Sequence, residues 1–308
     1  MDEPINENHR LNKVKVIVTI IIVIFLVATS TVLGINYAEK KESKRCFEQL
    51  QKLEEQARII EKQREEQRIL EEQKKKEEER LARIAKTEQP LSQDAQYNIM
   101  HIYNDTGEKR AFLTFDDGPS KQVTPLILDL LKKEQVPATF FVLGVNAQYN
   151  QELIKREFEE GHYVANHGFS HRYAQVYSSP EATLDEYNRT EQIIRDALGN
   201  QNYMSNLFRF PGGSNGGSYH TAKQASKALL REKGITYLDW NSLSQDAAGS
   251  YTKEQLLQNT IDTIGENESV IILMHDASDK ILTYEMLPDL INYLRENGYS
   301  FKNIYDII

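Results

Sequence analysis

Two adjacent carboxylates, Asp116 and Asp117, follow an apolar run and precede the turn residues Gly118 and Pro119. Successive side chains of a strand point in opposite directions, so the two carboxylates are expected to face different groups. One is then free to bind a metal ion while the other reaches a water molecule. Because Asp-Asp-Gly is also common in ordinary turns, this motif alone does not indicate catalysis.

A pair of histidines, His167 and His171, is spaced four residues apart. This spacing predicts that both rings lie on one face of a helix and can share a metal ion. A histidine pair in a loop could equally be structural. Together with one carboxylate at another strand end, however, the rings would form a His-His-Asp set with coordination positions open for water and substrate. The combination therefore favours a metal site.

Five segments resemble, in order, the five motifs of the polysaccharide deacetylase family, also called the NodB-homology domain or carbohydrate esterase family 4. They are residues 114–119, 167–171, 209–213, 239–241 with 244–246, and 273–275. Five motifs in the same order make the resemblance specific. It covers about 200 residues and implies a hydrolase that removes acetyl groups from a polysaccharide.

The resemblance implies a divalent metal ion, usually Zn²⁺, with Co²⁺, Mn²⁺ and Ni²⁺ as alternatives. Its ligands would be Asp117, His167 and His171. Asp116 would be the general base for the metal-bound water, because the metal lowers the pKa of that water and polarises the acetyl carbonyl. Arg209 would pair with Asp116 and keep it ionised.

The resemblance also implies that His275 protonates the leaving amine as general acid. Either Asp246 or Asp239 would orient this histidine. The metal and a backbone N–H near Gly212 would hold the tetrahedral oxyanion. The residues lining the acetyl pocket and substrate site would be Pro211, Gly212, Trp240 and Leu273.

The sequence departs from the family pattern at two places. Many members have Tyr-Gly after the proline of the third motif, where this chain has Gly212 and Gly213. The change keeps a backbone N–H but removes an aromatic side chain, so the substrate groove is expected to differ. The fourth motif often ends in Asp-Trp, whereas here Ala247 follows Asp246, which leaves the partner of His275 open.

Short apolar runs alternate with amphipathic helical stretches over residues 105–308. This alternation predicts βα units around a parallel sheet, and about seven units favour a distorted or incomplete (β/α) barrel over an open sheet. Catalytic residues of a barrel lie at the carboxyl ends of its strands. Ionisable groups do lie at or just after the predicted strand ends, at residues 115, 165, 210, 238 and 274.

An uncharged run, residues 16–37, is long enough to cross a membrane as a helix. The basic residues Arg10, Lys13 and Lys15 precede it, which predicts a cytoplasmic tail over residues 1–15 and an extracellular catalytic domain. The expected location is therefore the cell membrane, with a single pass. The alternative is a cleaved signal peptide, but its apolar core is normally shorter and this run ends in a poor match to a cleavage site.

Residues 38–88 contain no glycine or proline and are rich in Glu, Lys and Gln, which predicts a long charged helical stalk. Apolar residues spaced four and three apart run from Cys46 to Ile60 and then fade, so a coiled-coil homodimer is left open beside a plain spacer. Cys46 is the only cysteine, which excludes a disulfide within the chain. Residues 89–104 are predicted to be a linker.

The net charge of −9 gives no indication of nucleic-acid binding. Topology and resemblance together predict removal of N-acetyl groups from N-acetylglucosamine units of a cell-wall polysaccharide, with peptidoglycan as the expected substrate. One alternative is a deacetylase of another glycan, such as xylan, a chitooligosaccharide or an exopolysaccharide. Another is an inactive carbohydrate-binding module on a stalk, which the presence of base, ligands and acid disfavours.

Overall fold

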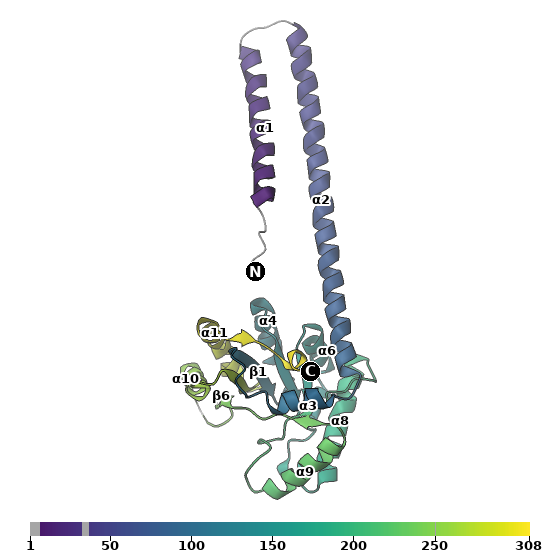
Figure 1. The fold of residues 1–308 in the computed structure, drawn as a ribbon, viewed down its shortest axis with the longest axis vertical. Coiled ribbons are helices and arrows are strands. Elements are labelled where there is room, and N and C mark those ends of the chain that lie inside the picture. The colour runs from purple at the N-terminus through teal and green to yellow at the C-terminus, as the bar shows by residue number, and fades with distance from the viewer. Residues whose placement is uncertain (1–6, 33–36, 250) are drawn as a thin grey trace. The chain divides into compact units, whose positions relative to one another are not determined.

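The structure, a computed structural model, describes residues 7–32, 37–249 and 251–308, with side chains over 14–26, 42–249 and 251–308. The chain divides into two compact units, Met1–Glu77 and Glu78–Ile308. The first contains helix α1 (Glu7–Val32) and most of helix α2 (Tyr37–Thr87), while the last turns of α2 belong to the second (Figure 1).

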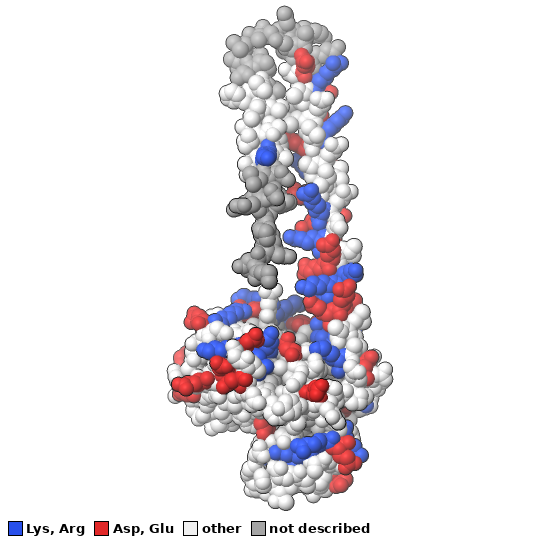
Figure 2. Space-filling view, viewed as in Figure 1, with Lys and Arg blue, Asp and Glu red and all other residues white. Residues whose placement is uncertain are grey.

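Helix α2 confirms the long charged helix predicted for residues 38–88. Figure 2 shows acidic and basic side chains mixed along it. Ion pairs join neighbouring turns, such as Lys76 with Glu72 at 2.6 Å and Arg68 with Glu65 at 2.7 Å. Exposed pairs of this kind contribute about 0.3–0.5 kcal/mol each. The homodimer through this helix stays a prediction.

The predicted cytoplasmic tail and membrane span, residues 1–37, include residues 1–6 and 33–36, which lie outside the described part of the chain. Within the described residues, none of the helices combines the length and apolar character needed to cross a bilayer. The membrane anchor therefore stays a prediction.

A single parallel sheet forms the centre of the second unit. Its strands are β1 (Arg110–Asp116), β2 (Ala138–Val142), β3 (Tyr163–Asn166), β4 (Leu207–Phe208), β5 (Thr236–Tyr237), β6 (Ser242–Leu243), β7 (Ser269–His275) and β8 (Ser300–Phe301). Their order is β5-β4-β3-β2-β1-β7-β6, and β8 also pairs with β1. Among the described residues, the edge strands β5 and β6 do not pair with each other. The sheet is thus an incomplete barrel, as predicted.

Helices connect the strands, as the alternating pattern predicts. They are α4 (Thr124–Glu134), α5 (Gly144–Ala147), α6 (Gln151–Glu159), α7 (Tyr173–Val176), α8 (Pro180–Leu198), α9 (His220–Glu232), α10 (Lys253–Ile264) and α11 (Ile281–Glu296), with a final 3₁₀ turn at Ile304–Asp306. Helix α8 begins at Pro180. The Ser179 hydroxyl accepts a hydrogen bond from Ala182 N, and Pro180 occupies the first helical position, which together start the helix there.

The central strands are buried along nearly their whole length. All of β2 is buried, and so are β1 and β7 except for the end residues Arg110 and His275. Parallel strands flanked by βα connections have both faces covered, which explains their continuous apolar runs. The core therefore fixes the positions of the strand ends, and with them the positions of the polar residues at the ends of β1 and β7.

The region predicted as a linker, residues 89–104, is instead part of the core. It forms helix α3 (Gln93–Met100), which starts where the Ser92 hydroxyl accepts a hydrogen bond from Ala95 N. Ala95, Ile99 and Ile102 pack into the main hydrophobic cluster. Their spacing of four and three residues is that of an amphipathic helix. The polar residues between them concealed this signal.

The end of α2 is also fixed to the second unit. The Lys86 ammonium donates hydrogen bonds to the carbonyls of Tyr305, at 2.6 Å, and Ile308, at 2.8 Å. Thr87 is fully buried, and its carbonyl accepts a hydrogen bond from Met204 N at 2.6 Å. The catalytic unit therefore begins near residue 78 and not at residue 105 as predicted.

Candidate active site

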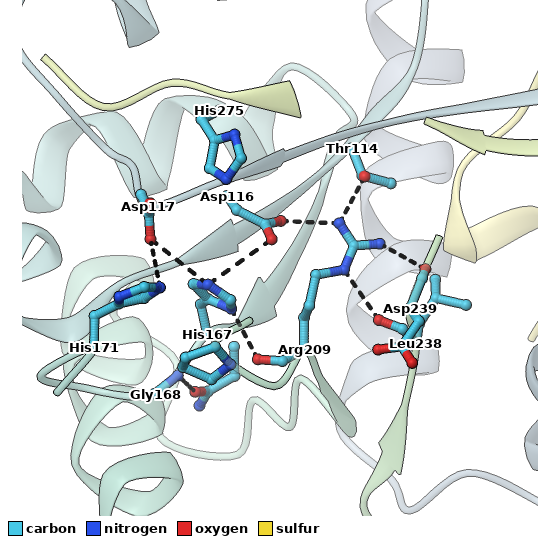
Figure 3. Close-up of polar contacts among 12 residues, drawn as sticks. Thr114, Asp116, Asp117, His167, Gly168, His171, Arg209, Leu238, Asp239 and His275 are labelled. Atoms are coloured by element: carbon cyan, nitrogen blue, oxygen red, sulfur yellow. Dashed lines mark hydrogen bonds and ion pairs between the residues drawn. The ribbon is translucent and has the colours of Figure 1, made fainter. Parts of the chain in front are cut away.

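The predicted catalytic residues converge at the carboxyl end of the sheet (Figure 3). Asp116 ends β1 and His275 ends β7, and these two are direct partners in the parallel register. His167 follows β3, and Arg209 follows β4. The expectation that polar residues at strand ends meet at one edge of the sheet is confirmed.

The two adjacent carboxylates face different groups, as predicted. Asp116 is buried and turns one oxygen toward Arg209, with 2.9 Å between Oδ1 and Nη1. Asp117 has a left-handed backbone, with φ of 70°, which sends its side chain toward the histidines. The Asn146 amide holds this turn by donating a 2.7 Å hydrogen bond to the Asp117 carbonyl. Gly118 follows because a Cβ there would collide with the Asp276 carboxylate.

Asp117, His167 and His171 form the one group of metal-ligating side chains within the described residues whose ligand atoms lie within 4.8 Å of each other. Asp117 Oδ1 is 3.6 Å from His167 Nε2 and 3.5 Å from His171 Nε2. Ligands about 2.0–2.2 Å from a tetrahedral zinc would be separated by roughly 3.3–3.6 Å. Asp117 Oδ1 is buried and has no hydrogen-bond partner in the described chain. The three side chains therefore fit a divalent metal ion.

The histidine pair does not lie on a helix, so that prediction is wrong. Residues 167–172 form a loop, in which Gly168 has φ of 80° and His171 has φ of 56°. These left-handed conformations interrupt any helix, and glycine adopts them without strain. The two rings nevertheless converge, with their centroids 5.3 Å apart.

A carboxylate that sequence reasoning missed, Glu186 of α8, holds this loop. Its oxygens accept hydrogen bonds from the backbone N–H groups of Phe169, at 2.8 Å, and Ser170, at 2.6 Å, and from the Ser170 hydroxyl at 2.7 Å. Glu186 is itself buried. Nothing in the local sequence links a residue on α8 with this loop, so only the tertiary structure identifies it.

His167 is set up to present one nitrogen to a metal. Its Nδ1 lies 2.8 Å from the Arg209 carbonyl, which can only accept a hydrogen bond, so Nδ1 carries the proton and the Nε2 lone pair faces Asp117. Burial lowers the pKa of His167 to about 3, against the opposing charge of Asp117. The ring is therefore neutral, as a ligand must be.

Arg209 is fully buried and binds four oxygens. Nη1 donates to Asp116 Oδ1 at 2.9 Å and to Thr114 Oγ1 at 2.7 Å. Nε and Nη2 donate to the carbonyls of Leu238 and Asp239, both at 3.0 Å. Burial raises the pKa of Asp116, and the nearby guanidinium opposes this rise. The result is an ionisable carboxylate that is a stronger base than an exposed aspartate.

His275 pairs with Asp246, so the choice left open by the sequence is resolved. Nδ1 of His275 lies 2.7 Å from Asp246 Oδ1. The Asp239 carboxylate instead accepts hydrogen bonds from Ser214, at 2.9 Å from N and 2.6 Å from Oγ. Burial alone would lower the pKa of His275, but the hydrogen bond and charge of Asp246 outweigh it and raise the pKa to about 9.

The residues predicted to line the substrate site lie beside these groups. Leu273 is buried in β7, and Trp240 lies 5.7 Å from the Arg209 guanidinium, measured to the ring centroid. A Cβ on Gly213 would lie 3.2 Å from the Trp240 ring, so the absence of a side chain there lets the indole pack against the backbone. The carbonyl of Pro211 accepts a 2.6 Å hydrogen bond from the Tyr177 hydroxyl, which sequence reasoning did not single out.

Comparison with known proteins agrees with this geometry. Residues 103–237 match the polysaccharide deacetylase family model. The putative polysaccharide deacetylase YheN of Bacillus subtilis is 34% identical over 221 residues, which cover 70% of this chain and 74% of that protein. The peptidoglycan-N-acetylglucosamine deacetylase PgdA of Listeria monocytogenes is 32% identical over 232 residues, and the match covers 74% of this chain but only 45% of that protein.

Solved structures give the same result. A Streptococcus mutans CE4 esterase superposes with a TM-score of 0.61 at 32% identity, and the match covers 69% of this chain and 91% of that chain. The family predicted from the five motifs is thereby confirmed. Since the sequence matches, the fold and the site geometry all agree, this chain belongs to the polysaccharide deacetylase family of hydrolases.

Proposed function

We propose that this chain is a metal-dependent hydrolase that removes N-acetyl groups from N-acetylglucosamine units of a cell-wall polysaccharide, with peptidoglycan as its substrate. The observation that carries the proposal is the position of a base and an acid beside the three ligating side chains. Asp116 Oδ2 lies 3.8 Å from His167 Nε2, and His275 is the register partner of Asp116 on the neighbouring strand. The similarity to the peptidoglycan-N-acetylglucosamine deacetylase of Listeria monocytogenes supports this substrate.

Asp116 would act as the general base. Its Oδ1 is held by Arg209, so Oδ2, which faces the ligating histidines, is the oxygen free to accept a proton from the attacking water. A divalent ion held by Asp117, His167 and His171 would lower the pKa of that water and polarise the acetyl carbonyl.

His275 would act as the general acid. Because Asp246 holds Nδ1, the proton on Nε2 is the one available to the leaving amine. The backbone N–H of Gly212 would donate to the developing oxyanion. Base and acid thus come from adjacent strand ends and can act on the same acetyl group in sequence.

The proposal is tested by acetate release from purified peptidoglycan by residues 78–308, with and without a chelator. We expect release that is lost on chelation and restored by added metal. Asp116→Asn provides the matched inactive control. Release from acetylated xylan but not from any N-acetylglucosamine polymer would assign the chain to a different glycan, and no release from either would favour a binding module.

The location is part of the proposal, with the catalytic unit anchored at the cell membrane and facing outward. The uncharged run of residues 16–37 and the basic residues before it support this arrangement. We expect the full chain to stay with membranes after alkaline washing and the catalytic unit to be digested by protease added to intact protoplasts. Recovery of the full chain in the soluble fraction would overturn the anchor without affecting the proposed reaction.

A further inference from the structure

Gly212 leaves no room for a side chain. Its backbone is left-handed, with φ of 71°, and a Cβ there would lie 2.6 Å from the Tyr173 hydroxyl oxygen and 3.0 Å from Cζ of the same ring. Real Cβ atoms essentially never approach a neighbour this closely. The phenol of Tyr173 therefore occupies the space in which a side chain at residue 212 would begin.

Tyr173 is held at this place by its neighbours. It opens α7, two residues after His171, and its ring centroid lies 5.4 Å from that of His171. It also lies 6.0 Å from the Tyr177 ring and 6.4 Å from the Tyr219 ring. Since the Tyr177 hydroxyl binds the carbonyl of Pro211, α7 and the loop that carries Gly212 are connected through these aromatic rings.

The Tyr173 hydroxyl is available for an incoming molecule. The residue is 39% exposed, and within the described chain no hydrogen bond involves its hydroxyl group. A phenol is both a donor and an acceptor. Its oxygen lies where the side chain of residue 212 would begin, next to the residue whose N–H is proposed to bind the oxyanion.

We propose that Tyr173 is a substrate-binding residue whose hydroxyl forms a hydrogen bond with a hydroxyl of the sugar unit being deacetylated. Tyr173 would thus supply, from another segment of the chain, the aromatic side chain that many family members carry at the position of Gly212. The inference rests on the proposed function, because it names a contact of that same substrate. A ground-state contact of this kind affects KM and leaves kcat nearly unchanged.

The kinetic test compares Tyr173→Phe with the parent chain on the same N-acetylglucosamine polymer. We expect KM to rise on the order of fivefold with kcat within about a factor of two. Tyr219→Phe, which removes a hydroxyl from the same aromatic cluster, is the matched control and should leave both constants unchanged. An unchanged KM in Tyr173→Phe, or an equal rise in both variants, overturns the contact.

A second measurement needs no substrate and tests whether the Tyr173 ring occupies the space of a side chain at residue 212. Gly212→Ala should lower the melting temperature more in the parent chain than in Tyr173→Ala, because the second change removes the colliding ring. Equal losses in both backgrounds overturn the spatial part of the inference. Thermal melting does not depend on turnover, so it distinguishes the two ideas. If the parent chain is inactive, the proposed function and the sugar contact are refuted. If Gly212→Ala still lowers the melting temperature less in the Tyr173→Ala background, the packing of Tyr173 against Gly212 is established.

Discussion

His275 and Asp246 form a closed hydrogen-bonded pair, with Nδ1 of the histidine 2.7 Å from Oδ1 of the aspartate. The other carboxylate oxygen accepts hydrogen bonds from His275 N, at 2.8 Å, and from the Thr283 hydroxyl, at 2.7 Å. Both aspartate oxygens are thus occupied, and the ring has one orientation and one tautomer. The carboxylate therefore controls the protonation of the proposed acid.

Asp246→Asn should move the alkaline limit of activity to lower pH. A general acid must be protonated, so turnover with a His275 pKa of about 9 should fall only as pH rises through that value. Removing the carboxylate charge lowers this pKa, by roughly 1–3 pH units. The pH dependence of kcat/KM, which reports the pKa of the free enzyme, measures the shift. Thr283→Val, which keeps the charge, should give a much smaller change, and an unmoved profile in Asp246→Asn would exclude His275 as the acid.

Asp117→Asn or His171→Ala should remove bound metal and activity together. His171→Ala deletes one of the three atoms that converge within 4.8 Å, and Asp117→Asn replaces the charged carboxylate by a neutral amide that binds a divalent ion weakly. Asp116→Asn should instead retain the metal and lower kcat by about 10²–10⁴-fold, as expected for loss of a general base. Metal content after dialysis, measured beside turnover, separates the two groups of variants. Full metal occupancy in Asp117→Asn would contradict the assignment of the ligands.

Arg209→Met should destabilise the catalytic unit by about 3–5 kcal/mol, because it leaves Asp116 buried without its partner. The free energy of unfolding in urea measures this loss. Since burial holds the Asp116 pKa above its unfolded value, folding takes up a proton there, and this contribution to stability is lost as pH rises through the folded pKa. The deficit of Arg209→Met should therefore shrink at acid pH.

A matched pair of variants tests whether the buried charge of Asp116 causes the loss of stability in Arg209→Met. Arg209→Met combined with Asp116→Asn should lose less stability than the sum of the two single changes, because the buried charge is gone. Arg209→Lys keeps the charge but cannot reach all four acceptors, and should lie between the parent and Arg209→Met. Additive losses would show that Arg209 stabilises the fold independently of Asp116.

A chain starting at residue 105 should be much less stable than one starting at residue 78. The shorter chain lacks α3, whose Ala95 and Ile99 are buried along with Ile102 just beyond the helix. Burying a large aliphatic side chain such as either isoleucine contributes about 1.5–3 kcal/mol. Thermal denaturation of the two fragments measures the difference. Equal melting temperatures would show that residues 89–104 are a linker after all.

Much of the site could be predicted because its signals are local. Apolar runs of β-formers indicate the strands β1 and β7, and the ionisable groups Asp116 and His275 stand at the ends of these runs. The loop that carries His167 and His171 could not be predicted, since its shape depends on Glu186, which is distant in sequence. The approach of Tyr173 to Gly212 could not be predicted for the same reason, because it joins segments about 40 residues apart in the sequence.

The pairing of β1 has a consequence for how the chain folds. This strand pairs with β2, about 25 residues away in sequence, and with β7, about 160 residues away. During synthesis His167, His171 and Arg209 emerge well before residues 269–275, and contacts of such long sequence separation form slowly. The strand that ends at Asp116 therefore obtains β7 as its neighbour late. A chain interrupted before β7 would hold every proposed metal ligand yet lack the strand that brings His275 beside Asp116.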